Sequence, residues 1–169
     1  VFEPVHGTLG VKAGGRGIVR DCFFGRPMGY SDSFDFTGGN RPSPILQFIN
    51  NVCIGSDDDI LDFDGTDAWV EGNVFMHVHR IGTPDSASAV IGGSNGADIS
   101  HITIVGNLFY DVDQAATAKQ GNFYTFLNNT VVDQNSRGSD EIGDGFQPAV
   151  LNFDDDNVAG QALGMYVEG

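Results

Sequence analysis

The sequence predicts an all-β fold, a solenoid of about six stacked coils, from its composition and from two repeated patterns. The chain has 169 residues, of which 40% are hydrophobic, and it contains 24 glycines. Nineteen of its 23 acidic residues are Asp, and only two residues are Lys. A bundle of long helices needs Ala, Leu, Glu and Lys on its surfaces, so this composition excludes that class.

The first repeated pattern is an apolar residue, two further residues, Asn or Asp, one more residue and an apolar residue. The central residue of the five copies is Asp21, Asn51, Asn73, Asn107 and Asn129. Successive copies are 30, 22, 34 and 22 residues apart. Asn tolerates the left-handed conformation that sharp turns require, and stacked amides hydrogen-bond to one another. We therefore expect this row to form one turn that recurs in every coil, with Asp21 as its first member.

The second pattern is a short strand in which the first and third residues are apolar and the second is usually polar. Its six copies occupy residues 9–12, 34–37, 61–64, 89–92, 116–119 and 151–154. A period of two indicates strands with one buried face, stacked at the roughly 4.8 Å spacing of a sheet. We expect internal stacks from the following apolar residues: Phe23, Phe34, Phe36, Leu61, Phe63, Phe75, Ile91 and Phe109.

The Asn-x-Phe row and the segment Leu61-Asp62-Phe63-Asp64-Gly65 resemble those of the pectin-lyase-like proteins. This resemblance covers residues 9–169 and implies a right-handed single-stranded parallel β-helix, forming one domain over residues 1–169. Members of the group include lyases, hydrolases, epimerases and adhesive stalks, so the fold does not fix the activity. The phrase Trp69-Val70-Glu71-Gly72 recurs as the last four residues, and no cap follows it. We therefore expect this chain to be a piece of a longer protein, truncated at both ends.

Acidic residues occupy the outward positions of the second pattern. One outward row is expected to contain Gly10, Asp35, Asp62, Val90, Thr117 and Asn152, and the next contains Asp64 and Lys119. Neighbouring carboxylates repel one another unless a cation or a shared proton relieves them. Asp35, Asp62, Asp64 and Lys119 are thus candidate catalytic residues for acid–base cleavage of a polysaccharide. The alternative is a solvated acidic face that keeps the sheet soluble.

Other polar residues suggest metal sites less directly. Asp57, Asp58 and Asp59 form an acidic turn of a composition that suits Ca²⁺, or a solvated loop. His77 and His79 have the spacing of a two-histidine site, but the sequence names no further ligand, so we interpret them as surface residues.

Four aromatic residues are candidates for stacking on sugar rings: Tyr30, Trp69, Tyr110 and Tyr124. Each has packing under a loop as its alternative role. The two cysteines, Cys22 and Cys53, take different positions in the repeat, which disfavours a disulfide between them.

The charge balance restricts the partners. With 23 acidic and eight basic residues, the net charge is −15, which opposes binding to nucleic acid and to anionic membranes. We expect a secreted or cell-surface module of bacterial type, without a complete catalytic motif in this segment, that interacts with a polysaccharide or glycan and with other coils or domains of its parent chain. The alternative is a polysaccharide lyase or glycoside hydrolase that uses the outward Asp and Lys residues, with Ca²⁺ as its candidate cofactor.

Overall fold

A computed structural model describes residues 11–13, 16–27, 32–36, 46–79, 88–92, 99–119, 122–134, 149–153 and 164–169. These residues form seventeen β-strands in three sheets, in which all pairings are parallel. None of them lies in a helix long and apolar enough to cross a membrane.

Among the described residues, each of the first five coils contributes one strand to each sheet, and the sixth contributes strands to sheets 1 and 2. Sheet 1 contains β1 (Val11–Ala13), β4 (Phe34–Phe36), β7 (Leu61–Asp62), β10 (Ser88–Gly92), β13 (Gln114–Ala118) and β16 (Leu151–Phe153). Sheet 2 contains β2 (Gly17–Arg20), β5 (Leu46–Ile49), β8 (Ala68–Glu71), β11 (His101–Val105), β14 (Phe123–Leu127) and β17 (Gly164–Glu168). Sheet 3 contains β3 (Phe23–Phe24), β6 (Val52–Ser56), β9 (Val74–Val78), β12 (Leu108–Val112) and β15 (Thr130–Val132).

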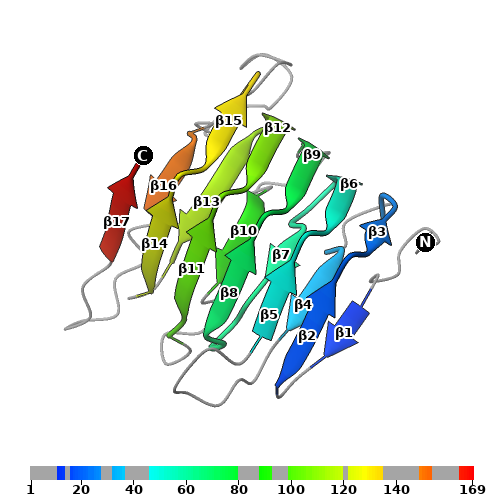
Figure 1. The fold of residues 1–169 in the computed structure, drawn as a ribbon, viewed down its shortest axis with the longest axis horizontal. Coiled ribbons are helices and arrows are strands. Elements are labelled where there is room, and N and C mark those ends of the chain that lie inside the picture. Colours follow the sequence, from blue (N-terminus) through cyan, green and yellow to red (C-terminus); the bar gives the residue numbers. More distant parts are fainter. Residues whose placement is uncertain are drawn as a thin grey trace.

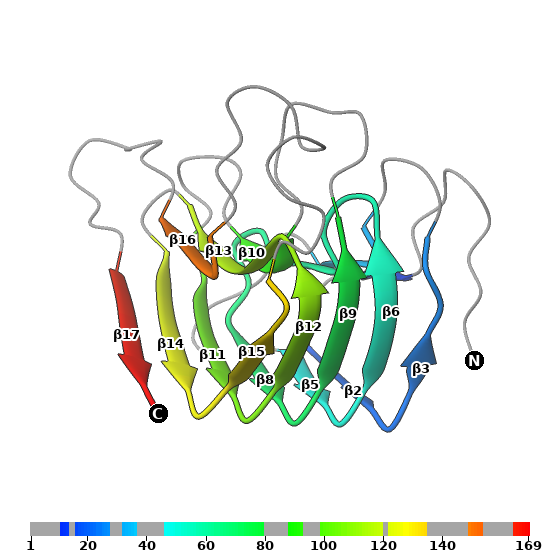
Figure 2. The same cartoon turned by 90° about the horizontal axis from the view of Figure 1, so that it is seen from above.

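The order of strands identifies the architecture as a parallel β-helix. Every strand pairs with the strand three places further along the chain, so the coils stack in sequence order along the long axis (Figure 1). Crossovers between parallel strands of one sheet are almost always right-handed. The fold class predicted from the repeats is therefore confirmed. Tight bends join the strands of sheet 2 to those of sheet 3 along one edge (Figure 2).

Phenylalanine rings stack through the interior from coil to coil. The centroids of Phe48 and Phe75 are 6.4 Å apart, those of Phe75 and Phe109 are 5.2 Å apart, and those of Phe109 and Phe126 are 5.8 Å apart. Such pairs add about 0.5–1.5 kcal/mol each beyond the apolar area they bury.

Two predicted members of the internal stacks are wrong. Phe23 pairs with Val52 on the outer face, and Phe24 occupies the interior position. Ile91 pairs with Asp62, and Val90, which pairs with Leu61, occupies the interior position.

The predicted asparagine row is present at the bend between sheets 2 and 3. The backbone N–H groups of Asn51, Asn73 and Asn107 each donate to the Oδ1 atom of the next asparagine, at 2.8, 2.8 and 2.9 Å. We call Asn51, Asn73, Asn107 and Asn129 the Asn ladder. Two details of the prediction are wrong. The left-handed residue is the one before each ladder position, and Cys22, not Asp21, is in register with Asn51.

The left-handed positions explain this correction. They are Asp21, Asn50, Gly72, Gly106 and Asn128, all with φ between 50° and 66°. In each coil the left-handed residue makes the bend, and the residue after it turns its side chain inward. An amide at that inward position can donate a hydrogen bond to one neighbouring coil and accept one from the other.

The register of sheet 1 differs from the prediction in two coils. Lys12 and Ile91, rather than Gly10 and Val90, lie in the row of Asp35 and Asp62. All five residues of β10 are buried, so its sequence lacks the alternation that would have fixed the register. Burial varies along this row: Asp35 is 7% exposed and Thr117 is fully buried, whereas Lys12 is exposed and Asp62 and Asn152 are half-buried.

Candidate functional site

Sheet 1 gathers five aspartates at its first coils. Asp35 on β4 lies in register between Lys12 on β1 and Asp62 on β7, and the Lys12 ammonium forms an ion pair with Asp35. Asp32 and Asp59 precede β4 and β7, and Asp64 follows β7. We call Asp32, Asp35, Asp59, Asp62 and Asp64 the acidic face.

Crowding of these carboxyl groups changes their protonation. Burial, together with the charges of Asp64, Asp32 and Asp35, raises the pKa of Asp62 to about 8. Burial and the charge of Asp35 raise the pKa of Asp32 to about 6. The nearby ammonium of Lys119 lowers the pKa of Asp62, but it does not offset the other effects. Asp62 is therefore a neutral acid at pH 7, next to other carboxyl groups on the same face.

The turn before β7 positions Asp59. The hydroxyl of Ser56 donates to the backbone carbonyl of Asp59 at 2.9 Å, which closes the turn. The carboxylate of Asp59 accepts a hydrogen bond from the backbone N–H of Ser88 at 2.6 Å, so it also holds the start of β10. Burial and the charges of Asp58, Asp32 and Asp62 raise the pKa of Asp59 well above its usual range.

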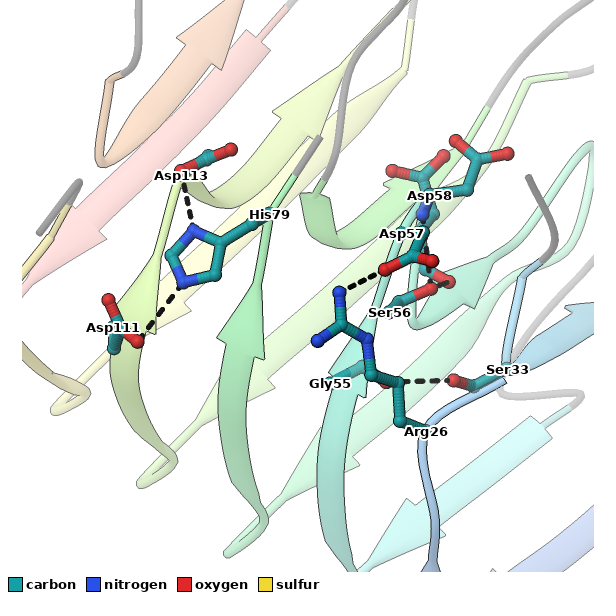
Figure 3. Close-up of polar contacts among 10 residues, drawn as sticks. Arg26, Ser33, Gly55, Ser56, Asp57, Asp58, His79, Asp111 and Asp113 are labelled. Carbon is teal, nitrogen blue, oxygen red and sulfur yellow. Dashed lines mark hydrogen bonds and ion pairs between the residues drawn. The ribbon is translucent and has the colours of Figure 1, made fainter. Parts of the chain in front are cut away.

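The three predicted metal ligands of this turn separate. Asp58 and Asp59 approach Asp32, and one carboxylate oxygen of each lies within 4.8 Å of the others. Asp57 instead points to Arg26, with which it forms an ion pair (Figure 3). The Asp32, Asp58 and Asp59 oxygens are hard ligands of the kind that Ca²⁺ prefers, so their chemistry fits that ion.

Tyr124 is not a surface residue, which corrects its prediction as a sugar-stacking residue. It projects inward from β14 and is fully buried, and its hydroxyl would lie 3.1 Å from a Cβ placed on Gly92 in sheet 1. Burial, with the charges of Asp62, Asp59 and Asp64, raises its pKa well above the usual range. Its hydroxyl and Asp35 Oδ1 are the buried side-chain polar atoms without a hydrogen-bond partner in the described part of the chain.

Two other predicted sugar-stacking residues lie on different sheets from the acidic face. Trp69 on β8 and Tyr110 on β12 are each 37% exposed, and they belong to sheets 2 and 3. Tyr30 lies outside the described residues. The structure therefore brings the four predicted catalytic residues together, because the charges of Asp35, Asp64 and Lys119 all act on the pKa of Asp62. It places Trp69 and Tyr110 on other sheets.

A second polar cluster lies at the end of β9 and β12 in sheet 3 and in the residues that follow these strands. The sequence suggested its two histidines as a pair but not its two aspartates. We call His77, His79, Asp111 and Asp113 the His–Asp cluster. His79 lies between two carboxylates, with Nε2 at 3.0 Å from Asp111 Oδ2 and Nδ1 at 2.9 Å from Asp113 Oδ1 (Figure 3). Burial disfavours the charged form of His79 and lowers its pKa. The hydrogen bonds to Asp113 and Asp111 outweigh this effect, so the pKa of His79 is raised. His79 is buried, so its interpretation as a surface residue is wrong.

The repeat contained a signal for this cluster. His77 and Asp111 are each four residues after a ladder asparagine, Asn73 or Asn107, and His79 and Asp113 are each six residues after it. Equal offsets in consecutive coils place side chains side by side. Histidine spacing along a single strand does not reveal this cluster, because its members come from two coils.

The cysteines are both free thiols, as their positions in the repeat predicted. Comparison with protein-family models, curated proteins and solved structures finds no match to this chain.

Proposed function

We propose that this chain is an extracellular, polysaccharide-interacting β-helix whose acidic face cleaves glycosidic bonds by acid–base chemistry. The observation that carries the proposal is the juxtaposition on one sheet of Asp62, a carboxylic acid that is neutral at pH 7, with Asp35 and Asp64. Pairs of carboxyl groups with different protonation states are the machinery of most glycoside hydrolases.

Asp62 is the general acid in this mechanism. Its proton is transferred to the oxygen of the glycosidic bond as that bond breaks, and the carboxylate that forms is stabilised by the ammonium of Lys119. Asp64, which follows on the same chain segment and is half-buried, is the base that takes a proton from the attacking water. Asp35, paired with Lys12, contributes the negative charge that keeps Asp62 protonated.

The substrate class follows from charge and from the resemblance to pectin-lyase-like proteins. The net charge of −15 and the concentration of carboxylates disfavour an anionic polymer, so we propose a neutral glycan. Asp32, Asp58 and Asp59 are the residues that would hold Ca²⁺ beside this face. When bound, that ion would supply a positive charge that attracts sugar oxygens and lowers the repulsion among the aspartates.

A binding module without turnover is the second candidate function. It is favoured by Trp69 and Tyr110, which are exposed on sheets 2 and 3 rather than beside the acidic face. Flat aromatic rings on an outer sheet surface suit sugar stacking without chemistry.

The test is release of reducing ends from a panel of neutral and acidic polysaccharides. We expect turnover of a neutral glycan, which Asp62→Asn lowers by about 10²–10⁴-fold, because general acid catalysis contributes that much. Asp133→Asn, which makes the same chemical change at an exposed position after β15, is the matched control and retains activity. Binding without turnover by the wild type would leave the second candidate. Unsaturated products would instead indicate a lyase, with Lys119 as the base.

A further inference from the structure

The His–Asp cluster is built by two adjacent strands that interrupt their ladder at the same place. In β9 and β12, Met76 pairs with Tyr110 and Val78 with Val112. The residues between those pairs, His77 and Asp111, have φ values of 58° and 55°. The same position is left-handed in the neighbouring coils, at Gly55 on β6 (φ 93°) and at Asp133 after β15 (φ 52°), so this bend belongs to the repeat. In the coils of β9 and β12 it carries an imidazole and a carboxylate.

The interruption brings three potential metal ligands together. Asp111 Oδ2 lies 2.7 Å from His77 Nδ1 and 3.0 Å from His79 Nε2. The three atoms all lie within 4.8 Å of one another. In a tetrahedral zinc site, with bonds of about 2.0–2.1 Å, neighbouring nitrogen and oxygen ligands are roughly 3.3 Å apart. To admit an ion, the distances from Asp111 Oδ2 to His79 Nε2 and to His77 Nδ1 need to widen by about 0.3 and 0.6 Å.

Asp113 fixes how His79 presents its ring. The Asp113 carboxylate is 1% exposed and accepts a hydrogen bond from Nδ1 of His79. When Nδ1 carries the ring proton, Nε2 presents a lone pair toward Asp111 Oδ2, which is itself an acceptor. A proton on Nε2, which makes His79 an imidazolium, or a metal ion fills the position between these two atoms. A carboxylate that holds the far nitrogen of a histidine is also the usual support of a metal-binding imidazole.

The donor set indicates the kind of ion. Two imidazole nitrogens and one carboxylate oxygen suit zinc and related transition metals, whereas Ca²⁺ and Mg²⁺ prefer oxygen ligands alone. Three protein ligands leave a fourth position for water or substrate, as in catalytic zinc sites. The side chain of His77 is 49% exposed, so solvent reaches this side of the cluster.

We propose that His77, His79 and Asp111 bind one divalent transition-metal ion, with zinc as the principal candidate, and that Asp113 is a positioning residue for His79. This site is separate from the acidic face, and it does not depend on the function proposed there. The competing explanation is a purely structural hydrogen-bond network in which a proton occupies the space between His79 and Asp111.

The experiment is calorimetric titration of the chelator-treated full chain with Zn²⁺ at neutral pH. We expect one site per chain, and we expect Co²⁺ in its place to give the visible absorption bands of a four-coordinate nitrogen and oxygen site. Excess Ca²⁺ leaves the zinc affinity unchanged. Zinc also raises the melting temperature, because it binds the folded chain.

Substitutions distinguish the proposed metal ligands from residues that do not bind the metal. His77→Asn and Asp111→Asn remove one ligand each, and Asn tolerates the left-handed backbone at both positions. Each lowers the zinc affinity by more than about 100-fold, whereas Asp113→Asn lowers it by about 10–100-fold, the range of outer-shell partners. His101→Asn, at an exposed histidine on β11, and Asp58→Asn, at the acidic turn, are controls that retain wild-type affinity.

Circular dichroism of each metal-free variant verifies that it is folded. Absence of a stoichiometric zinc site in the wild type would overturn the proposal. So would wild-type affinity in folded His77→Asn and Asp111→Asn, or a loss of binding in Asp58→Asn instead. Absence of glycan turnover together with stoichiometric zinc binding would contradict the function proposed for the acidic face and would support the zinc site.

Discussion

Two corners of the same solenoid differ in whether successive coils place the same type of side chain there. At the corner between sheets 2 and 3, the Asn ladder places the same amide in four consecutive coils. The Oδ1 atoms of Asn73, Asn107 and Asn129 each accept a hydrogen bond from the backbone N–H of the ladder residue in the preceding coil. At the corner between sheets 3 and 1, the residues that follow β6, β9 and β12 are Asp57, His79 and Asp113. Figure 3 shows His79 beside Asp113, whereas Asp57 pairs with Arg26.

The difference follows from what each group can donate and accept. An amide is both donor and acceptor, so identical amides satisfy one another along a row. A carboxylate only accepts, so neighbouring carboxylates need protons, cations or histidines between them. The regular corner therefore contributes stability, and the irregular corner and the acidic face beside it accumulate groups with altered protonation. The two corners should respond differently to pH and to substitution.

The largest expected effect is on the pH dependence of stability. Asp62 and Asp32 hold protons more tightly when folded than when unfolded, because their pKa values rise from 3.8 to about 8 and about 6. The free energy of unfolding therefore falls as pH rises from about 4, up to about 6 for Asp32 and about 8 for Asp62. Each group contributes a slope of about 1.4 kcal/mol per pH unit. Urea unfolding across this range measures it.

Asp62→Asn isolates one contribution to that profile. Because Asn cannot ionise, the variant should be less sensitive to pH and more stable than the wild type at pH 8. Asp133→Asn should reproduce the wild-type profile. A flat wild-type profile, or an Asp62→Asn variant as sensitive as the wild type, would contradict the assignment of a neutral acid to this position.

The regular corner should be most sensitive to deletion of an amide. Asn73 accepts from Asn51, donates its Nδ2 to the carbonyl of Phe48 at 2.8 Å and to Asn107 at 2.9 Å, and is buried. Asn73→Ala leaves several of these groups without partners and should cost about 3–4 kcal/mol of unfolding free energy.

Asn128→Gly is the control for this corner, because it changes an exposed residue whose left-handed backbone glycine also accepts. We expect its free energy of unfolding to stay within about 0.5 kcal/mol of the wild type. Equal costs for the two variants would mean that the bend itself, rather than the ladder, stabilises the corner.

Asp113→Asn should have an intermediate effect at the irregular corner. Asn retains the shape and one acceptor but loses the charge that His79 contacts, and hydrogen bonds to charged groups are worth about 1.5–3 kcal/mol. We expect a loss of about 2 kcal/mol, measured by urea unfolding in the presence of a chelator. A cost as large as that of Asn73→Ala would remove the distinction between the corners.

The smallest effect on stability is expected outside both corners, at Trp69. This side chain is exposed, and its Nε1 donates to Glu71 at 2.7 Å. Trp69→Ala should change the free energy of unfolding by about 0.5 kcal/mol or less. Affinity electrophoresis in a neutral glycan should nevertheless show weaker retention, whereas Thr103→Ala, its neighbour in the sheet, is retained normally. Unchanged retention of the Trp69 variant would remove this residue from the binding surface.

Much of this architecture could be predicted from local repetition. The Asn-x-Phe row and the period-two strands predicted the fold class, because each coil must repeat the same inward residues to bury its faces. The same repeats placed Asp35 beside Asp62, a pairing that the structure shows. Prediction failed where the alternation was lost, as in β10, where Ala89, Val90 and Ile91 are all buried and a shift by one residue changes no pattern.

The sequence by itself determined the solenoid, the Asn ladder and the gathering of aspartates on one sheet, because these depend on residue types at repeated intervals. The tertiary structure alone decided which atoms meet across coils. It turned Tyr124 inward toward sheet 1, placed His79 between two carboxylates and buried the outer side of Asp35. Protonation depends on burial and on charges from neighbouring coils. Those are properties of the assembled stack, which no single repeat contains.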